Sequence, residues 1–472
     1  MSQPPAELEA FRKLLEATSL SSEQQRPVLE SDALVGPELG LLLRRCAVPH
    51  DFDRPLLRRL GESDQQTAAA RFEAFAELSI MQVGDGALSL HERWRRPLWA
   101  WWLRDEQRLE FIALSRTLAD WFDSLAKVAD SGSQVRQIQS RRRMFHLLGC
   151  DTDKGIREFE RLCRLARHSW AFSECNLLIR LVKEYEPILN PRQSAVLHYH
   201  EGKLASDLKE WELALATFRS VTGEPVADPG VKIKAIVRAA HALRNLGRNQ
   251  EALKELQRAQ EQISLSHDAV DLLWRVLYEL GEVYRDLGDL DSAERTLRAA
   301  LGDARKAKEP ADLAGVLNSL GTVQARLGNT TQAIDSFRLS LDYLQRSGDA
   351  LRPGAVLNNL GLAQLEKTDW SDAQSSFAAS LERMRAAGDR GGQATALLNS
   401  SRAQVALGDF VAAGDSAERA AKLFREAGDS ASAERALLQS AAAARASLQQ
   451  SRRRGIIPRA IANLKRLFTR SP

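Results

Sequence analysis

Histidines are the residues of this sequence best suited to chemistry, but their spacing argues against catalysis. His198 and His200 precede Glu201 in a stretch with a helical pattern. Residues two apart on a helix point to different faces, so these groups cannot easily share a metal ion. His241 has basic neighbours, which should lower its pKa without supplying a nucleophile or a carboxylate partner. The sequence therefore predicts neither a metal site nor a catalytic histidine.

Cysteine and glycine give no catalytic motif either. The cysteines form no Cys-x-x-Cys pair and lie within helical patterns, which favours buried, reduced thiols. They are Cys46, Cys150, Cys163 and Cys175. The one Gly-Lys pair, Gly202-Lys203, is followed by Leu, so the sequence lacks the glycine-rich loop that binds phosphates. We therefore expect a protein that is not an enzyme and has no cofactor.

The composition is typical of a soluble globular protein. The 472 residues are 44% hydrophobic and 27% charged, and the net charge of +4 is too small to indicate nucleic-acid binding. The first twenty residues mix acids and bases and contain no continuous apolar run. We expect neither a secretory signal nor a membrane-spanning helix, and a cytoplasmic location.

A period of 40 residues runs through the second half of the sequence. Glycine, alanine and a Gly-Asp pair each recur at their own phase. The recurring residues are Gly281, Gly321 and Gly361, then Ala293, Ala333, Ala373 and Ala413, and then Gly348-Asp349, Gly388-Asp389 and Gly428-Asp429. A weaker copy upstream contains Gly202, Ala214 and Phe218. Such a period predicts stacked helical hairpins, because one hairpin cannot bury its apolar face until a neighbour covers it.

The repeated residues resemble the tetratricopeptide repeat over about residues 192–446. Small residues stand where two helices touch, so the backbones can approach closely. We expect Phe218, Phe337 and Phe377 to fill the gap to the next hairpin. Glutamines 324, 364 and 404 occupy a phase at which the family usually has tyrosine. Their amides are either packed and satisfied within the repeat or available to a ligand.

The N-terminal third has a different pattern. Two or three short helices precede two apolar runs, at 79–83 and 87–91, which Gly84-Asp85-Gly86 separates as in a tight hairpin. This stretch resembles the winged-helix segment before the repeats of signal-transduction ATPases of the STAND class and of related bacterial regulators. Four tryptophans follow, and we interpret them as packing between units or as an exposed contact surface. They are Trp94, Trp99, Trp101 and Trp102.

The predicted fold is all-α: a right-handed tetratricopeptide-repeat solenoid with a small winged-helix-like module that contains one β-hairpin. The predicted parts are an N-terminal helix and linker at 1–32, the module at 33–105, a helical connector with a divergent repeat at 106–190, the solenoid at 191–446, and a basic amphipathic helix at 447–472.

The family resemblance implies a binding groove lined by the first helix of each hairpin. The corresponding residues are Lys203, Lys234, Arg238, His241, Arg244, Arg275 and Arg285 on the early part of the wall, and Asn318, Asn358, Asn359, Asn399 and Arg402 on the later part. Asparagine carries a donor and an acceptor and can pair with a peptide backbone, and the basic part would favour acidic groups. Alternatively, these are solvated wall residues, and binding uses the convex side or the loops.

The C-terminal segment has an apolar face and a basic face at helical spacing. The apolar residues are Ile457, Ile461, Leu464 and Phe468, and the basic ones include Arg459, Lys465 and Arg466. This segment could cap the last repeat, dock on a partner or lie on an anionic membrane.

We therefore expect an adaptor or sensor that binds a protein or peptide in the repeat groove, in signalling or regulation. One alternative is a transcription regulator whose winged helix binds DNA. Glu73 and Glu77 oppose Arg71 on the presumed recognition helix, which argues against DNA as a partner. Another alternative is a subunit that assembles with a separate STAND-type ATPase.

Overall fold

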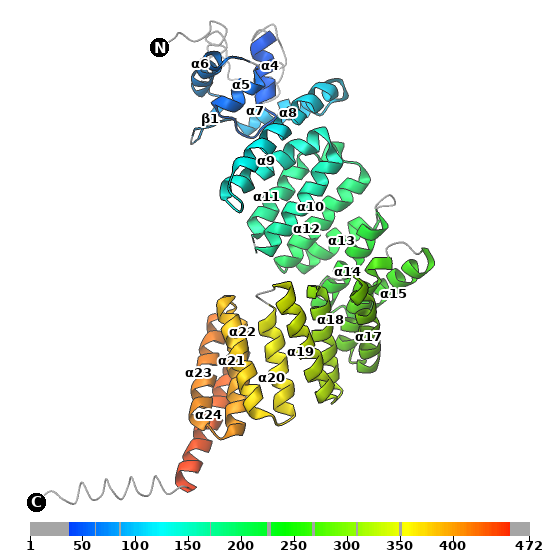
Figure 1. Cartoon of the computed structure of the whole chain (residues 1–472), viewed down its shortest axis with the longest axis vertical. Coiled ribbons are helices and arrows are strands. Elements are labelled where there is room, and N and C mark those ends of the chain that lie inside the picture. The colour runs from blue at the N-terminus through cyan, green and yellow to red at the C-terminus, as the bar shows by residue number, and fades with distance from the viewer. Residues whose placement is uncertain are drawn as a thin grey trace, which may run out of the picture. The chain divides into compact units, whose positions relative to one another are not determined.

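The computed structural model describes residues 37–61, 63–84, 86–169, 171–223, 228–266, 270–307, 310–348 and 352–453. These residues are almost entirely helical, and their one sheet is a two-stranded hairpin (Figure 1). The predicted fold, an all-α solenoid with a small β-hairpin near its N-terminus, is confirmed. The chain divides into two compact units, Met1–Asp228 and Pro229–Pro472. In the described part of the chain, no helix has both the length and the apolar character needed to cross a membrane.

The first unit begins with helices and a hairpin. They are α4 (Pro37–Cys46), α5 (Arg54–Leu60), α6 (Gln65–Ala76), β1 (Met81–Val83), β2 (Leu88–Leu90) and α7 (Glu92–Trp102). Asp53 and Asp64 cap α5 and α6 by accepting backbone N–H bonds. The strands pair antiparallel with Met81 opposite Leu90, and Phe52 bonds to Leu88 on the other side of β2. The sheet is thus extended by a bridge from the segment between α4 and α5.

A helical connector follows the hairpin and shares its core. Its elements are η1 (Asp105–Gln107), α8 (Arg108–Val128), α9 (Gln134–Cys150), α10 (Thr152–His168), α11 (Phe172–Lys183) and η2 (Glu186–Ile188), and the unit ends with α12 (Pro191–Asp207) and α13 (Trp211–Gly223). Trp94, Trp99 and Trp102 are buried in one core that runs from Leu39 to Leu204. Trp102 donates to the carbonyl of Arg44 at 2.7 Å. For these tryptophans the packing interpretation is confirmed.

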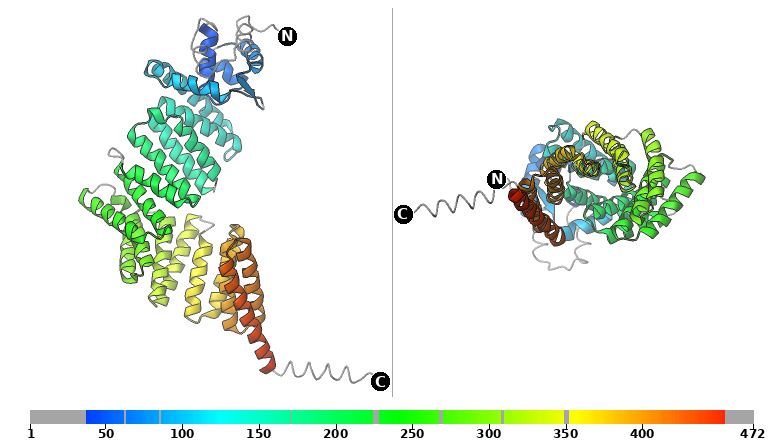
Figure 2. Two further views of the ribbon diagram at one scale, coloured as in Figure 1. Left: turned by 180° about the vertical axis from the view of Figure 1, so that it is seen from behind. Right: turned by 90° about the horizontal axis from the view of Figure 1, so that it is seen from below.

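The second unit is a stack of antiparallel helical hairpins (Figures 1 and 2). Its elements are α14 (Pro229–Asn245), α15 (Asn249–Ser266), η3 (Val270–Leu272), α16 (Leu273–Leu287), α17 (Leu290–Ala307), α18 (Pro310–Arg326), α19 (Thr330–Ser347), α20 (Pro353–Glu366), α21 (Trp370–Ala386), α22 (Arg390–Leu407), α23 (Phe410–Glu426) and α24 (Ser430–Arg453). The range predicted for the solenoid, 191–446, thus includes the hairpin α12–α13 of the first unit as well as the helices of the second.

The repeated glycines are required by close helix packing. A Cβ atom on Gly321 would lie 2.7 Å from the ring of Phe337, and one on Gly361 would lie 2.6 Å from that of Phe377. Real Cβ atoms do not approach other atoms this closely, so any side chain here would push the aromatic ring out of the core. The prediction that glycine stands where two helices touch is confirmed, and Phe337 also shares a core with Val356 and Leu360 of the next hairpin, as expected.

The turns of the hairpins use left-handed backbone conformations. Gly328 and Gly408 have φ values of 82° and 81° between the two helices of their hairpins. Thr368 occupies the same phase with a φ of 67°, although a β-branched residue is disfavoured there. The turn between the two helices thus keeps the same backbone conformation in this hairpin, although it has no glycine at this position.

The first helices of successive hairpins approach one another more closely than the second helices do. Contacts join α14 to α16, α16 to α18, α18 to α20 and α20 to α22. In a curved stack the layer whose members approach more closely lies on the inside of the curve. The wall made by α14, α16, α18, α20 and α22 is therefore the inner wall of the second unit.

Candidate functional site

Most of the residues predicted to bind a ligand lie on the inner wall of the second unit. Lys234, Arg238, His241 and Arg244 lie on α14, Arg275 and Arg285 on α16, Asn318 on α18, Asn358 and Asn359 on α20, and Asn399 and Arg402 on α22. Lys203 lies on α12 in the first unit, with its ammonium 5.8 Å from the ring centroid of Tyr199. The residues predicted for the C-terminal helix, 457–468, lie outside the described part of the chain.

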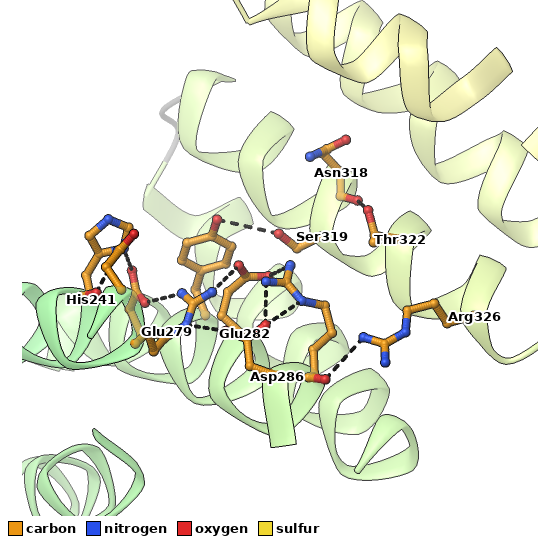
Figure 3. A network of polar contacts seen from close by, with 12 residues as sticks. His241, Glu279, Glu282, Asp286, Asn318, Ser319, Thr322 and Arg326 are labelled. Atoms are coloured by element: carbon orange, nitrogen blue, oxygen red, sulfur yellow. Dashed lines mark hydrogen bonds and ion pairs between the residues drawn. The ribbon is translucent and has the colours of Figure 1, made fainter. Parts of the chain in front are cut away.

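Arg244 is held by three carboxylates of the next inner helix, which are labelled in Figure 3. It forms ion pairs of 2.9 Å with each of Glu279, Glu282 and Asp286 on α16. The Arg244 side chain is only 10% exposed. Burial tends to lower its pKa, but the three carboxylates raise the pKa above its usual value. Arg244 therefore joins α14 to α16 and is not a free cation.

Arg275 and Arg285 also have acidic partners. Arg285 pairs with Glu282 at 2.7 Å and with Asp286 at 2.8 Å. Arg275 pairs with Asp312 on α18 at 2.9 Å. Carboxylates that were not among the predicted site residues thus offset the positive charge expected on this part of the wall. Their position on the same inner face, at i, i+3 and i+7 along α16, could have revealed them.

His241 lies beside this network, with Nδ1 3.8 Å from Glu279 (Figure 3). Its pKa is lowered, as predicted, but burial is the largest cause, and the nearby Arg238 and Arg244 add to it. Glu279 opposes the shift.

The asparagines form pairs between consecutive inner helices. Asn359 donates through Nδ2 to Oδ1 of Asn318 at 3.1 Å, which joins α20 to α18. Asn399 donates in the same way to Asn358 at 3.0 Å, which joins α22 to α20. Each pair links residues 41 positions apart. We call these four residues the asparagine face.

The pairing leaves part of each amide group available. Among the described residues, nothing bonds to Nδ2 of Asn318 or Asn358, or to Oδ1 of Asn359. Oδ1 of Asn399 lies 3.5 Å from Arg402. An amide that uses one oxygen or one N–H group in a pair keeps further hydrogen-bonding capacity. The face thus presents both donors and acceptors in fixed positions.

Two of the three glutamines left open by the sequence are packed inside the repeat. Gln324 and Gln364 are buried, and their Oε1 atoms accept from Ser336 at 2.7 Å and from Ser376 at 2.6 Å. Their amides therefore stabilise hairpins rather than face a ligand. Gln404 is partly buried, and its Oε1 has no hydrogen-bond partner in the described structure.

The other histidines and the cysteines considered for chemistry lie in packed or ion-paired environments. His200 is buried against Phe159, while His198 lies 3.8 Å from Glu186. Within the described ranges, no three His, Cys, Asp or Glu residues gather as metal ligands would. The cysteines are free thiols, of which Cys46, Cys163 and Cys175 are buried.

Comparison with known proteins agrees with this architecture. The tetratricopeptide-repeat family model matches residues 272–346 and 312–386. The matched residues run from α16 through α21, where the inner helices carry the acidic network and the first asparagines. The chain therefore contains tetratricopeptide repeats within residues 272–386, and an N-terminal helical module precedes its helical hairpins. No curated protein matches the sequence significantly.

Solved structures are similar to this chain at low sequence identity. A STAND protein with a tetratricopeptide-repeat sensor from Pyrococcus horikoshii is similar over 96% of this chain and 68% of its own, at 14% identity and a TM-score of 0.50. BtubC from P. vanneervenii is similar over 46% of this chain and 90% of its own, at 21% identity and a TM-score of 0.41. A Rap protein complexed with competence and sporulation factor is similar over 74% and 98%, at 12% identity and a TM-score of 0.45.

Proposed function

We propose that this protein is a non-catalytic adaptor or sensor whose second unit binds an extended protein segment along the asparagine face. The observation that carries the proposal is the pairing of asparagines between consecutive inner helices, which orients their remaining amide groups. Tetratricopeptide-repeat hairpins provide the stacked wall on which such a ladder can form.

The spacing of the wall matches an extended chain. Packed helices lie about 8–10 Å apart, and an extended chain rises about 3.3 Å per residue. One asparagine pair therefore meets the bound backbone at about every third residue. Because amides bond to main-chain groups, this contact fixes the direction and register of the segment and tolerates many side chains.

The charge of the wall limits what the segment can carry. In the Arg244 network, Arg244 and Arg285 meet the three carboxylates of Glu279, Glu282 and Asp286, so no surplus of positive charge is left. The face from α18 to α22 is neutral at its asparagines. We therefore expect no strong requirement for an acidic segment, which revises the preference suggested by the basic residues alone.

A peptide selection tests the proposal. Peptides would be selected from a displayed random library against the full chain, and the affinity of the best one would be measured by calorimetry. A variant with Asn318, Asn358, Asn359 and Asn399 all changed to Ala should bind at least about tenfold more weakly, since several hydrogen bonds are lost. Asn329→Ala, in an exposed turn between α18 and α19, is the matched control and should bind like the parent.

Chemical modification of the peptide separates backbone recognition from side-chain recognition. N-methylation at every third residue removes main-chain donors and should weaken binding in one of three registers. Equal affinity in all registers, or an unchanged affinity of the fourfold asparagine variant, would contradict the proposed site.

The N-terminal helices and hairpin are proposed to act as a winged-helix-like module that reports on the bound state. Two of its arginines are paired with carboxylates, Arg54 with Glu73 and Arg71 with Glu38, which reduces the charge free for DNA. A gel-shift experiment with salt titration addresses the DNA alternative: a steep loss of binding with salt would favour it, since phosphate contacts release counterions.

A further inference from the structure

A cavity of about 230 Å³ lies in the first unit, away from the asparagine face. It is enclosed by the segment after α4 and by helices α8, α9 and α11. Its lining residues are Pro49, His50, Asp51, Phe122, Arg141, Arg142, Phe145, His146, Leu177 and Leu181. Pockets for drug-sized ligands are usually larger, about 300–1,000 Å³, so this cavity suits a smaller molecule.

One polar group in the cavity wall lacks a partner. His146 is only 2% exposed, and its Nδ1 has no hydrogen bond in the described structure. Its ring stacks on Phe122 at 5.4 Å with an angle of 7° between the planes, which fixes its orientation. Burial, with help from His50, Arg142 and Arg95, lowers the pKa of His146 well below its usual value. The neutral ring can thus accept or donate one hydrogen bond that the protein leaves unmade.

Two guanidinium groups line the same cavity and keep unused donors. Arg141 bonds to Glu174 through Nη1 only, at 3.0 and 3.1 Å. Arg142 bonds to Asp51 through Nη2, and its guanidinium lies 5.5 Å from the ring of Phe122. Guanidinium has five N–H donors, so both arginines can also hold a ligand carboxylate. Asp51 is the one carboxylate among the lining residues.

The remaining wall is apolar. Phe122, Phe145, Leu177 and Leu181 form it, and Leu177 at the rim is 37% exposed. An apolar wall combined with guanidinium groups fits a molecule with one charged end and one hydrocarbon body. We propose that this cavity binds a small organic carboxylate with an apolar body.

Occupancy of the cavity would involve the contact between the N-terminal module and the connector. His50 bonds to Glu184 at 2.7 Å, and Arg95 bonds to the same carboxylate at 2.7 Å. Trp99 of α7 donates to the backbone carbonyl of Glu184 at 3.0 Å. A ligand that touches His50 therefore binds next to the residues that join α7 to the end of α11.

Calorimetry on the full chain tests this site with benzoate, phenylacetate and isovalerate as probes, and with benzamide as the neutral counterpart of benzoate. At least one carboxylate should bind, and benzamide should bind about tenfold more weakly than benzoate because it lacks the charge. His146→Phe removes the unpaired nitrogen, and Leu177→Trp fills the rim. Each substitution should lower the affinity for the carboxylate by about tenfold or more.

Matched controls lie on the same helices or at similar exposure. Leu165→Trp replaces a leucine that is 54% exposed on α10, outside the cavity, and Arg136→Gln changes an exposed residue of α9. Both should keep the parent affinity. The proposal is overturned if none of the three carboxylates binds, if benzamide binds as well as benzoate, or if Leu177→Trp leaves affinity unchanged. The exposed position of Leu177 keeps this last variant informative even if His146→Phe folds poorly.

Discussion

Individual glycines of the repeat are required either by contact distance or by backbone conformation, and the two requirements have different consequences. Gly321 allows α18 to touch Phe337 of α19, whereas glycine at 328 or 408 allows a left-handed turn. Glycines of both kinds recur at the repeat period, so a comparison of the hairpin sequences cannot tell the two requirements apart. Substitution of single glycines can distinguish them.

Gly321→Ala should destabilise the protein by about 1–3 kcal/mol, because its Cβ would lie 2.7 Å from the Phe337 ring. Gly315 lies in the same helix with open space around it, so Gly315→Ala should be neutral or stabilise by about 0.5–1 kcal/mol. Urea unfolding of both variants measures the difference. Equal effects of the two substitutions would mean that the contact with Phe337 is unimportant.

Thr368→Gly should stabilise the protein by about 1 kcal/mol, because the left-handed conformation at φ 67° penalises a β-branched side chain. Thr395→Gly, on an exposed face of α22, should instead cost a few tenths of a kcal/mol. Thermal and urea unfolding would show the opposite signs. A loss of stability in Thr368→Gly would show that the threonine side chain contributes more than the backbone strain.

At the scale of helices, hairpins could be predicted from sequence, but contacts between hairpins could not. The period of 40 residues and the Gly–Phe spacing are local patterns, and they correctly placed the paired helices. The acidic partners of Arg244 lie 35–42 residues further on, and their contact depends on how α16 is rotated against α14. The asparagine pairs likewise depend on how one inner helix is rotated against the next. The sequence therefore indicated the asparagines as candidates but could not indicate that they pair.

Arg244→Met should destabilise the second unit by about 3 kcal/mol, because Glu279 and Glu282 stay nearly buried after losing a cation. Arg298→Gln breaks a more exposed pair with Glu294 on α17 and should cost only about 0–1 kcal/mol. Urea unfolding followed by circular dichroism gives both values. A small effect at Arg244 would indicate that water reaches the two carboxylates.

Because His146 is buried, we expect the stability of the first unit to decrease in acid. Its folded pKa is below the usual 6.5, so the unfolded chain binds a proton that the folded chain does not. The contribution of the neutral ring is complete above about pH 6.5 and is lost as pH falls towards the folded pKa. His241 shifts in the same direction in the second unit.

Unfolding free energy should therefore decrease between pH 7.5 and pH 5.5, and His146→Phe should show a shallower decrease. Carboxylates whose pKa is lowered, such as Glu184, stay ionised in this range and do not obscure the result. Identical slopes for the parent and His146→Phe would mean that the ring can be protonated without cost.

For the whole molecule, the two compact units carry two different kinds of proposed binding site. The first unit has a continuous core from Leu39 to Leu204 and encloses a small cavity with cationic groups. The second has small cores that each join helices of neighbouring hairpins, and a wall with paired amides. This division suits a sensor in which a protein segment and a small molecule are recognised at separate places.

Photo-crosslinking tests the central claim most directly. A selected peptide that carries a photoreactive residue would be bound to the full chain, irradiated, and its attachment points mapped by mass spectrometry. We expect cross-links on the inner helices α18, α20 and α22. Cross-links confined to the outer helices α19, α21 and α23, or to the first unit, would contradict the proposed binding face.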